Sequence, residues 1–288
     1  MSVTADDPSC VAPDRVFPPF GDEALLLACL LGDVEGRRVV DVGTGSGILA
    51  LVAASRGAFA VGIDVNRLAL ACAKSNAMTN RLEHRVAWCE GDLLEPVRTA
   101  SFDMVVADPP FLPTPPGTRL FLSSDGGPFG VAAIERLVPR ARSVLRPGGR
   151  MLLLALALGN EKTTLVESLC HRAFGGSGDA VYVHDVYGVS QPASVLTDCY
   201  SGWPGVDPWR RMLEERRLDR IRFLLIEAWR ETGFCKPAQL PTLNRDAYSG
   251  SWAGRIARYQ SWLSTLTACH HERPAAKSKP RSLRHRRG

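Results

Sequence analysis

A short apolar run that leads into a cluster of glycines is the most constraining feature of this 288-residue sequence. Residues 39–47 read VVDVGTGSG, and an apolar stretch with helical spacing follows. Glycine lets a backbone pass close to a ligand because it has no Cβ, and the first N–H groups of a helix are available to that ligand. We therefore expect a strand, a turn and a helix that together bind a nucleotide-like molecule.

Short β-branched runs alternate with longer helical patterns from residue 18 to about residue 158. This alternation is typical of a mostly parallel sheet with crossover helices, and predicts an α/β fold. The predicted strands are residues 38–42, 60–63, 86–89, 104–107 and 151–158. The predicted helices are residues 47–56, 66–80 and about 131–145.

Three aspartates stand at or beside the ends of the first three predicted strands, namely Asp41, Asp64 and Asp92. The dinucleotide pattern GxGxxG does not fit, because Gly47 follows Gly45 by only two residues. A carboxylate at Asp64 could accept hydrogen bonds from both hydroxyls of a ribose. Because open α/β sheets bind ligands at the carboxyl ends of their strands, we expect the three acids to surround one site.

The fourth predicted strand runs into Asp108, Pro109, Pro110 and Phe111. The two prolines fix φ and lack N–H donors, so nearby carbonyl groups are free to face a substrate. Asp108 and the Pro109 carbonyl could hold a planar amine or amide, and Phe111 could stack on it or face a positively charged sulfur as a cation–π partner. A rigid turn without catalytic function is the alternative interpretation.

Together these motifs resemble the class I S-adenosylmethionine-dependent methyltransferases. The resemblance implies a Rossmann-like, mostly parallel seven-stranded sheet with helices on both faces. It implies S-adenosyl-L-methionine as cofactor, S-adenosyl-L-homocysteine as product, and no metal. In this family the glycine turn holds the methionine part, the second-strand acid the ribose and the third-strand acid the adenine amine. The implied cofactor-binding residues are Asp41, Gly43, Thr44, Gly45, Gly47, Asp64, Val65, Asp92, Leu93 and Asp108.

Residues 108–111 also match the [Asn/Asp/Ser]-Pro-Pro-[Tyr/Phe] signature of methyltransferases that act on nitrogen. With residues 17–22 and 126–127, they resemble the protein N5-glutamine methyltransferases that modify peptide-chain release factors, over about residues 15–170. The resemblance implies Asp108, Pro109, Pro110 and Phe111 as catalytic residues. Asp108 stands where that family has Asn. The expected acceptor is therefore a planar nitrogen of a protein glutamine or of a small molecule.

Two other functions stay open at this point. A base amino-methyltransferase acting on RNA or DNA would use the same Pro-Pro loop, and the basic residues 273–288 could contact phosphates. Seven of the 35 basic residues lie there, which leaves 28 basic against 30 acidic residues in the rest of the chain. The nucleic-acid function is not favoured, because no recognised RNA-binding motif precedes this tail. A non-catalytic module that binds the cofactor is the third alternative.

We expect four parts along the chain: an N-terminal arm (1–17), a methyltransferase domain (18–200), a helical Trp-rich extension (201–272) and a disordered basic tail (273–288). Within the extension we expect one helix from Asp207 to Gly233 and another over residues 252–266. No secretory signal and no apolar run of about 20 residues is present, so we expect a cytoplasmic protein without a membrane partner.

Overall fold

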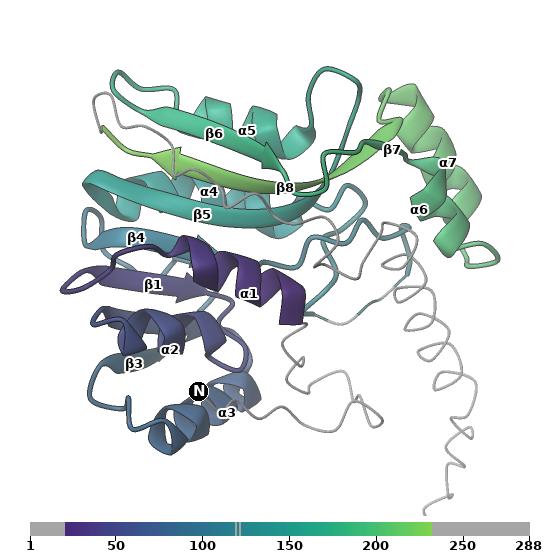
Figure 1. Cartoon of the computed structure of the whole chain (residues 1–288). Helices are drawn as coiled ribbons and strands as arrows, with labels where there is room; N and C mark the ends of the chain where they lie inside the picture. Colours follow the sequence, from purple (N-terminus) through teal and green to yellow (C-terminus); the bar gives the residue numbers. More distant parts are fainter. Residues whose placement is uncertain (1–20, 119, 121, 232–288) are drawn as a thin grey trace, which may run out of the picture. The chain divides into compact units, whose positions relative to one another are not determined.

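The computed structural model describes residues 21–118, 120 and 122–231 (Figure 1). All of them lie in the first of the two units into which the chain divides, Met1–Ala247. The predicted arm, the helix expected over 252–266 and the basic tail lie outside the described residues. The helices and strands are α1 (Gly21–Leu30), β1 (Arg38–Val42), α2 (Ile48–Ser55), β2 (Phe59–Asp64), α3 (Arg67–Thr79), β3 (Val86–Glu90), β4 (Phe102–Ala107), α4 (Ala132–Val144), β5 (Leu145–Gly159), α5 (Leu165–Ala173), β6 (Ala180–Asp185), β7 (Gln191–Pro192), α6 (Ser194–Cys199), α7 (Val206–Glu215) and β8 (Arg220–Trp229).

One mixed sheet organises these elements, with the strand order β3-β2-β1-β4-β5-β8-β6 and β7 paired to β8. Strands β1 to β5 run parallel, and β8 runs antiparallel to β5, β6 and β7. The prediction of a mostly parallel α/β sheet is confirmed. The sheet has eight strands rather than seven, since the two-residue β7 lies beside the main order.

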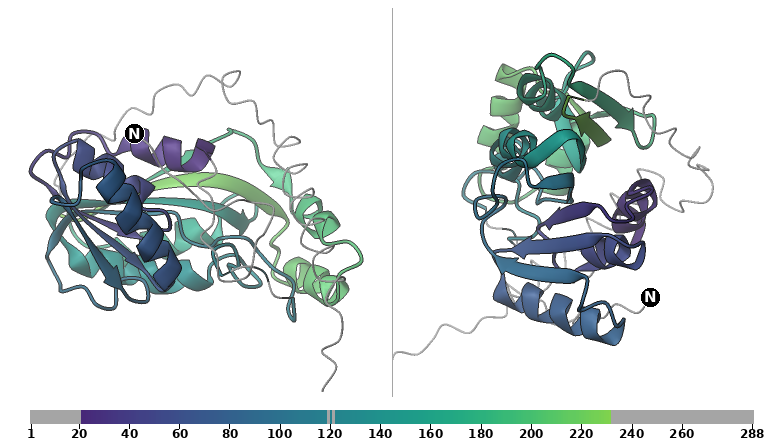
Figure 2. Two further views of the ribbon diagram at one scale, coloured as in Figure 1. Left: turned by 90° about the horizontal axis from the view of Figure 1, so that it is seen from below. Right: turned by 90° about the vertical axis from the view of Figure 1, so that its left-hand side faces the viewer.

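Helices cover both faces of the sheet (Figures 1 and 2). The chain moves outward from β1 to β2 to β3, whereas it moves the other way from β4 to β5. Because parallel crossovers are right-handed, these opposite directions put α2 and α3 on one face and α4 on the other. Helix α1 packs with α2, and α5 packs with α4.

Residues 216–229 do not form the predicted helix. The helix expected from Asp207 to Gly233 ends at Glu215, and Arg217 turns the chain with a φ of 54°. Strand β8 follows and pairs with β5 over its full length, from Gly159↔Arg220 to Arg150↔Trp229. Part of the segment expected as a helical extension therefore supplies an interior strand of the sheet, between β5 and β6.

A buried ion pair joins β5 and β8 to α1. Arg150 Nη1 lies 2.7 Å from Oε1 of Glu227, which is 2% exposed. Arg150 Nη2 also donates to the carbonyl oxygens of Leu30 and Leu31 at the end of α1. Its guanidinium stacks over the ring of Trp229 at 5.2 Å. One side chain thus satisfies the last carbonyls of a helix and ties that helix to two strands.

Among the helices of the described residues, none has the length and apolar character needed to cross a bilayer.

Candidate active site

The glycine turn between β1 and α2 combines an open part and a packed part. Gly43 and Gly45 have positive φ values of 70° and 54°. A Cβ on Gly43 would meet no atom within 4 Å, and one on Gly45 would meet only the Gly43 carbonyl oxygen at 3.9 Å. A Cβ on Gly47 would instead lie 2.8 Å from Trp88 and 2.9 Å from Ala73. Gly43 and Gly45 therefore leave room for a ligand, whereas Gly47 lets the turn pack against β3 and α3.

Asp41 lies behind this turn and holds it in place. Its carboxylate is 2% exposed, and Oδ2 accepts hydrogen bonds from Thr44 Oγ1 at 2.6 Å and from the backbone N of Ala50 at 3.1 Å. Burial raises the pKa of Asp41 to about 6, although both hydrogen bonds lower it. These contacts make Asp41 a positioning residue for the turn and for the start of α2; its direct contact with a cofactor stays a prediction.

Asp64 stands at the end of β2, directly beside the turn. Its Oδ2 accepts a hydrogen bond from the backbone N of Gly45 at 2.9 Å, and its Oδ1 accepts one from Asn66 at 2.9 Å. A carboxylate oxygen has two lone pairs, so each oxygen can accept a further hydroxyl. Burial raises the pKa of Asp64. The structure thus brings the second-strand acid and the glycine turn together, with Val65 exposed beside them.

Asp92 follows β3 at the same edge of the sheet. The backbone N of Gly91 donates to the Asp64 carbonyl oxygen at 3.1 Å, so the two loops are neighbours. The Asp92 carboxylate itself forms an ion pair with Arg136 of α4, with an N–O distance of 2.7 Å. Leu93 has a positive φ of 51°. A role of Asp92 and Leu93 at an adenine ring stays a prediction.

The Asp108–Phe111 loop leaves β4 at this edge too, because Ala107 is paired with Val42 of β1. Asp108 and Pro110 are half-buried, and Pro109 is buried. Phe111 is 7% exposed and meets Phe223 of β8 edge to face, with ring centroids 5.8 Å apart. The loop therefore lies next to the glycine turn, and the aromatic contact with β8 anchors it.

Phe223 in turn packs against Tyr187, at a ring distance of 5.6 Å. Neither residue was among the predicted site residues, and Phe223 lies in the segment that was expected to be a helix. Asn76 was missed as well. It is 1% exposed, and its Nδ2 donates to the Ser46 carbonyl oxygen at 2.9 Å, which supports the glycine turn from α3. A polar amide on the apolar side of a helical pattern was the available signal for Asn76.

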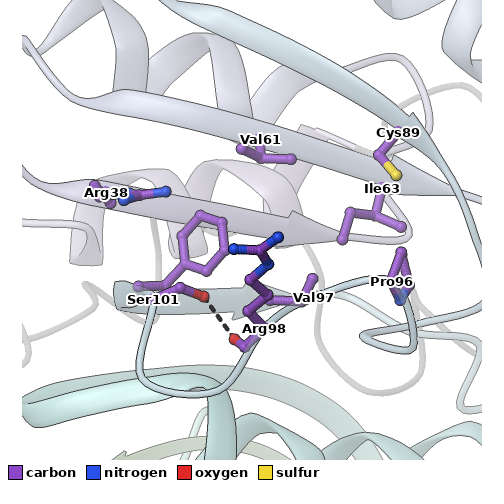
Figure 3. A pocket seen from close by; sticks show the side chains of 9 residues that line it. Arg38, Val61, Ile63, Cys89, Pro96, Val97, Arg98 and Ser101 are labelled. Carbon is purple, nitrogen blue, oxygen red and sulfur yellow. Dashed lines mark hydrogen bonds between the residues drawn. The ribbon is translucent and has the colours of Figure 1, made fainter.

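A separate pocket lies away from the glycine turn (Figure 3). A Cβ on Gly62 would point toward Trp88 and Thr44, so the alternation along β2 turns the side chains of Val61 and Ile63 to the opposite face of the sheet. The residues that line the pocket are Arg38, Val61, Ile63, Cys89, Pro96, Val97, Arg98, Ser101 and Phe102. None of the predicted site residues is among them, so this pocket is distinct from the candidate active site.

The chain is similar in sequence to known methyltransferases. Residues 21–175 match the model of the methyltransferase small domain family. A protein of Methanocaldococcus jannaschii, provisionally named a protein N5-glutamine methyltransferase, is 34% identical over 156 residues, which are 52% of this chain and 77% of that protein. The release factor glutamine methyltransferase of Moorella thermoacetica is 37% identical over 177 residues, 57% of this chain and 61% of its own length. The chain thus spans less than two thirds of the Moorella relative.

A solved structure, the 16S rRNA N2 G1207 methyltransferase of T. thermophilus, is 26% identical with a TM-score of 0.41, over 56% of this chain and 39% of that chain.

Proposed function

Because the chain belongs to the methyltransferase small domain family, we propose that it methylates the side-chain amide nitrogen of a glutamine in a peptide-chain release factor. The enzyme is an S-adenosyl-L-methionine-dependent methyltransferase, and it releases S-adenosyl-L-homocysteine. The observation that carries the acceptor proposal is the Asp108–Phe111 loop at the carboxyl end of β4, beside the open glycine turn. The names of the relatives from Moorella and Methanocaldococcus support glutamine as the acceptor.

The residues at the turn fit the cofactor. Gly43 and Gly45 leave space where side chains would stand, and Asp64 lies beside Gly45 with lone pairs available for two ribose hydroxyls. We assign the methionine part to the turn and the ribose to Asp64. The cofactor supplies a methyl group on a positively charged sulfur, which is an intrinsically good leaving group. The protein therefore needs mainly to position the two reactants.

Asp108 and Pro109 would position the acceptor. An amide nitrogen is a weak nucleophile because its lone pair is delocalised into the carbonyl group. A carboxylate at Asp108 accepts an N–H of the amide, and the Pro109 carbonyl can accept the second. These two acceptors fix the amide plane and increase electron density on the nitrogen, which gives up one proton after methylation. Phe111, held by Phe223, would line the same space.

The test uses the purified full chain, S-adenosyl-L-methionine with a labelled methyl group, and three acceptors: a bacterial release factor, total RNA and a small-molecule extract. We expect label in the release factor, and mass spectrometry should place one methyl group on a glutamine side chain. A release factor with that glutamine replaced by alanine is the control. Label in RNA or in the extract alone would overturn the glutamine proposal. Binding of the cofactor with no label in any acceptor would point to a non-catalytic module.

Two variants test the assigned residues. Asp108→Ala should remove methyl transfer but leave binding of S-adenosyl-L-homocysteine intact, as measured by calorimetry. Asp64→Ala should lower that binding about 100-fold, since two hydrogen bonds to a charged group contribute roughly 3 kcal/mol together. Glu90→Gln, which changes an acid at the end of β3 that pairs with Arg67, is the matched control. Unchanged binding by Asp64→Ala would contradict the ribose assignment.

A further inference from the structure

We propose that the α6–α7 segment, residues 193–217, determines which acceptor the enzyme uses, because it holds the loop that continues from Phe111. This loop, which the structure describes at residues 112–118, 120 and 122–130, is called the acceptor loop below. The inference rests on the proposed methyl transfer at Asp108. The α6–α7 segment lies after residue 175, where the match to the family model ends.

Two buried aromatic residues anchor the acceptor loop near both of its ends. Trp209 is 0% exposed, and its Nε1 donates a hydrogen bond to the Pro128 carbonyl oxygen at 2.7 Å. Tyr200 is 1% exposed and shares a side-chain hydrogen bond with Thr114. The two rings meet edge to face, with centroids 5.6 Å apart. A rigid aromatic pair therefore fixes the outgoing and returning parts of the loop at the same time.

The middle of the acceptor loop has its own contacts with the segment. Gly205, which precedes α7, has a φ of 82°, and a Cβ on it would overlap the Pro116 carbonyl oxygen. Thr118 Oγ1 donates to the Pro204 carbonyl oxygen at 3.4 Å. The two backbones thus approach so closely that only glycine fits at position 205.

A further contact involves a charged side chain at the end of α7. The guanidinium of Arg216 lies over the ring of Phe129, 4.6 Å from its centroid, which is a favourable cation–π distance. Phe129 is adjacent to Pro128, so this contact strengthens the hold of α7 on the returning part of the loop.

The acceptor loop transmits this hold to the catalytic residues. Its two parts pair with each other, since Leu112 N donates to the Ser124 carbonyl oxygen at 3.0 Å and Gly126 N donates to the Leu112 carbonyl oxygen at 2.9 Å. A Cβ on Gly126 would lie 2.8 Å from the carbonyl carbon of Phe111, and Gly130 packs against the same carbonyl group. A shift of residues 124–130 must therefore move Phe111, which we place at the acceptor.

Two glycines of the segment provide a matched test. Gly202 and Gly205 share a φ of 82°, so alanine is equally strained at both positions. A Cβ on Gly202 would meet nothing within 4 Å, whereas one on Gly205 would displace Pro116. We expect Gly205→Ala to raise the KM for the release factor on the order of tenfold, and Gly202→Ala to leave it within about twofold. Both variants should keep their affinity for S-adenosyl-L-homocysteine.

Trp209→Phe keeps an aromatic side chain, although a smaller one, and removes the donor to Pro128. Loss of one hydrogen bond predicts about a fivefold effect on acceptor KM. Trp203→Phe is its control, since Trp203 also packs edge to face on Tyr200, at 5.7 Å. An unchanged KM in both Gly205→Ala and Trp209→Phe, or an equal loss in Gly202→Ala, would overturn the specificity role.

Hydrogen exchange makes the inference testable without an acceptor. We expect faster exchange of the amides of residues 112–130 in Gly205→Ala, and unchanged exchange of residues 41–50. Unchanged exchange of the acceptor loop would overturn the inference by itself. Failure of the wild-type enzyme to methylate a release factor would overturn the proposed acceptor instead, and the exchange result would still decide whether the segment holds the loop.

Discussion

At the scale of single residues, Asp41, Asp64, Gly43 and Gly45 are neighbours, because the parallel strands β1 and β2 end at one edge of the sheet. The hydrogen bonds of the two aspartates show different roles, which their positions in the sequence do not distinguish. Asp41 faces inward to Thr44 and Ala50, whereas Asp64 borders the open side of the turn.

The buried carboxyl group of Asp41 predicts a specific pH dependence of stability. Burial raises its pKa from 3.8 to about 6, so the folded protein binds this proton more tightly than the unfolded chain does. The stabilisation is therefore full below about pH 4 and is lost as the pH rises through about 6. Between about pH 4 and pH 7 the wild type should lose up to about 3 kcal/mol of unfolding free energy relative to Asp41→Asn. Parallel curves from urea denaturation of the two proteins would contradict this.

Asp108 supports a prediction about acceptor chemistry. An Asn side chain accepts with its oxygen and donates with its nitrogen, so Asn at this position can pair with both the N–H and the carbonyl group of an amide. Asp108→Asn should therefore keep or raise kcat/KM for a glutamine acceptor, and Asp108→Ala should abolish it. With an amine acceptor, which has no carbonyl group, Asp108→Asn should be slower than the wild type. A loss of activity toward glutamine in Asp108→Asn would argue against an amide acceptor.

At the scale of elements, the glycine turn should show two separable effects. Gly47→Ala forces a Cβ against Trp88 and Ala73, and should lower the unfolding free energy by about 1–3 kcal/mol beyond the strain of its positive φ. Gly43→Ala has open space around it, so its stability should fall less while its Cβ enters the expected cofactor space. Calorimetry with S-adenosyl-L-homocysteine and thermal unfolding measure the two effects. A larger stability loss in Gly43→Ala would contradict this assignment.

Element boundaries were predictable where the chain carries glycines, prolines and strong alternation. Strand β1 has the predicted bounds, and helices α2 to α4 differ by one residue at each end. The failure at β8 has a physical cause. Trp209, Leu213, Ile221, Leu225 and Trp229 are separated by four or eight residues, a spacing that fits one face of a helix and also one face of a strand. Between α7 and β8 the chain turns at Arg217, which has a left-handed conformation. No Gly or Pro stands there to indicate from the sequence that the helix ends.

The supports of the catalytic loop were unpredictable for a related reason. Phe111 meets Phe223, and Pro128 meets Trp209, across more than 80 residues of chain. A single sequence gives the burial tendency of each aromatic side chain but not its partner. Trp209, for example, is completely buried, but its apolar character does not indicate that Pro128 is its partner.

At the scale of the whole described fold, the Arg150–Glu227 pair should matter more than any surface ion pair. Glu227 is buried and the Arg150 side chain is only 12% exposed, so removal of one leaves the other charge without its partner. Glu227→Gln should lower the unfolding free energy by about 3–5 kcal/mol, whereas Glu90→Gln, at the exposed pair with Arg67, should change it by less than about 1 kcal/mol. Similar melting temperatures for the two variants would show that the buried pair contributes little.

The position of β8 in the sheet has a consequence for how the protein is made. Strand β5 is an apolar strand whose one neighbour, β4, precedes it in the chain, while the other, β8, is formed by residues 220–229. During synthesis on the ribosome, the far edge of β5 therefore stays without its partner until the whole α6–α7 segment has been translated. The α6–α7 segment, which we propose selects the acceptor, must therefore be translated before β8 can pair with β5 and complete the sheet.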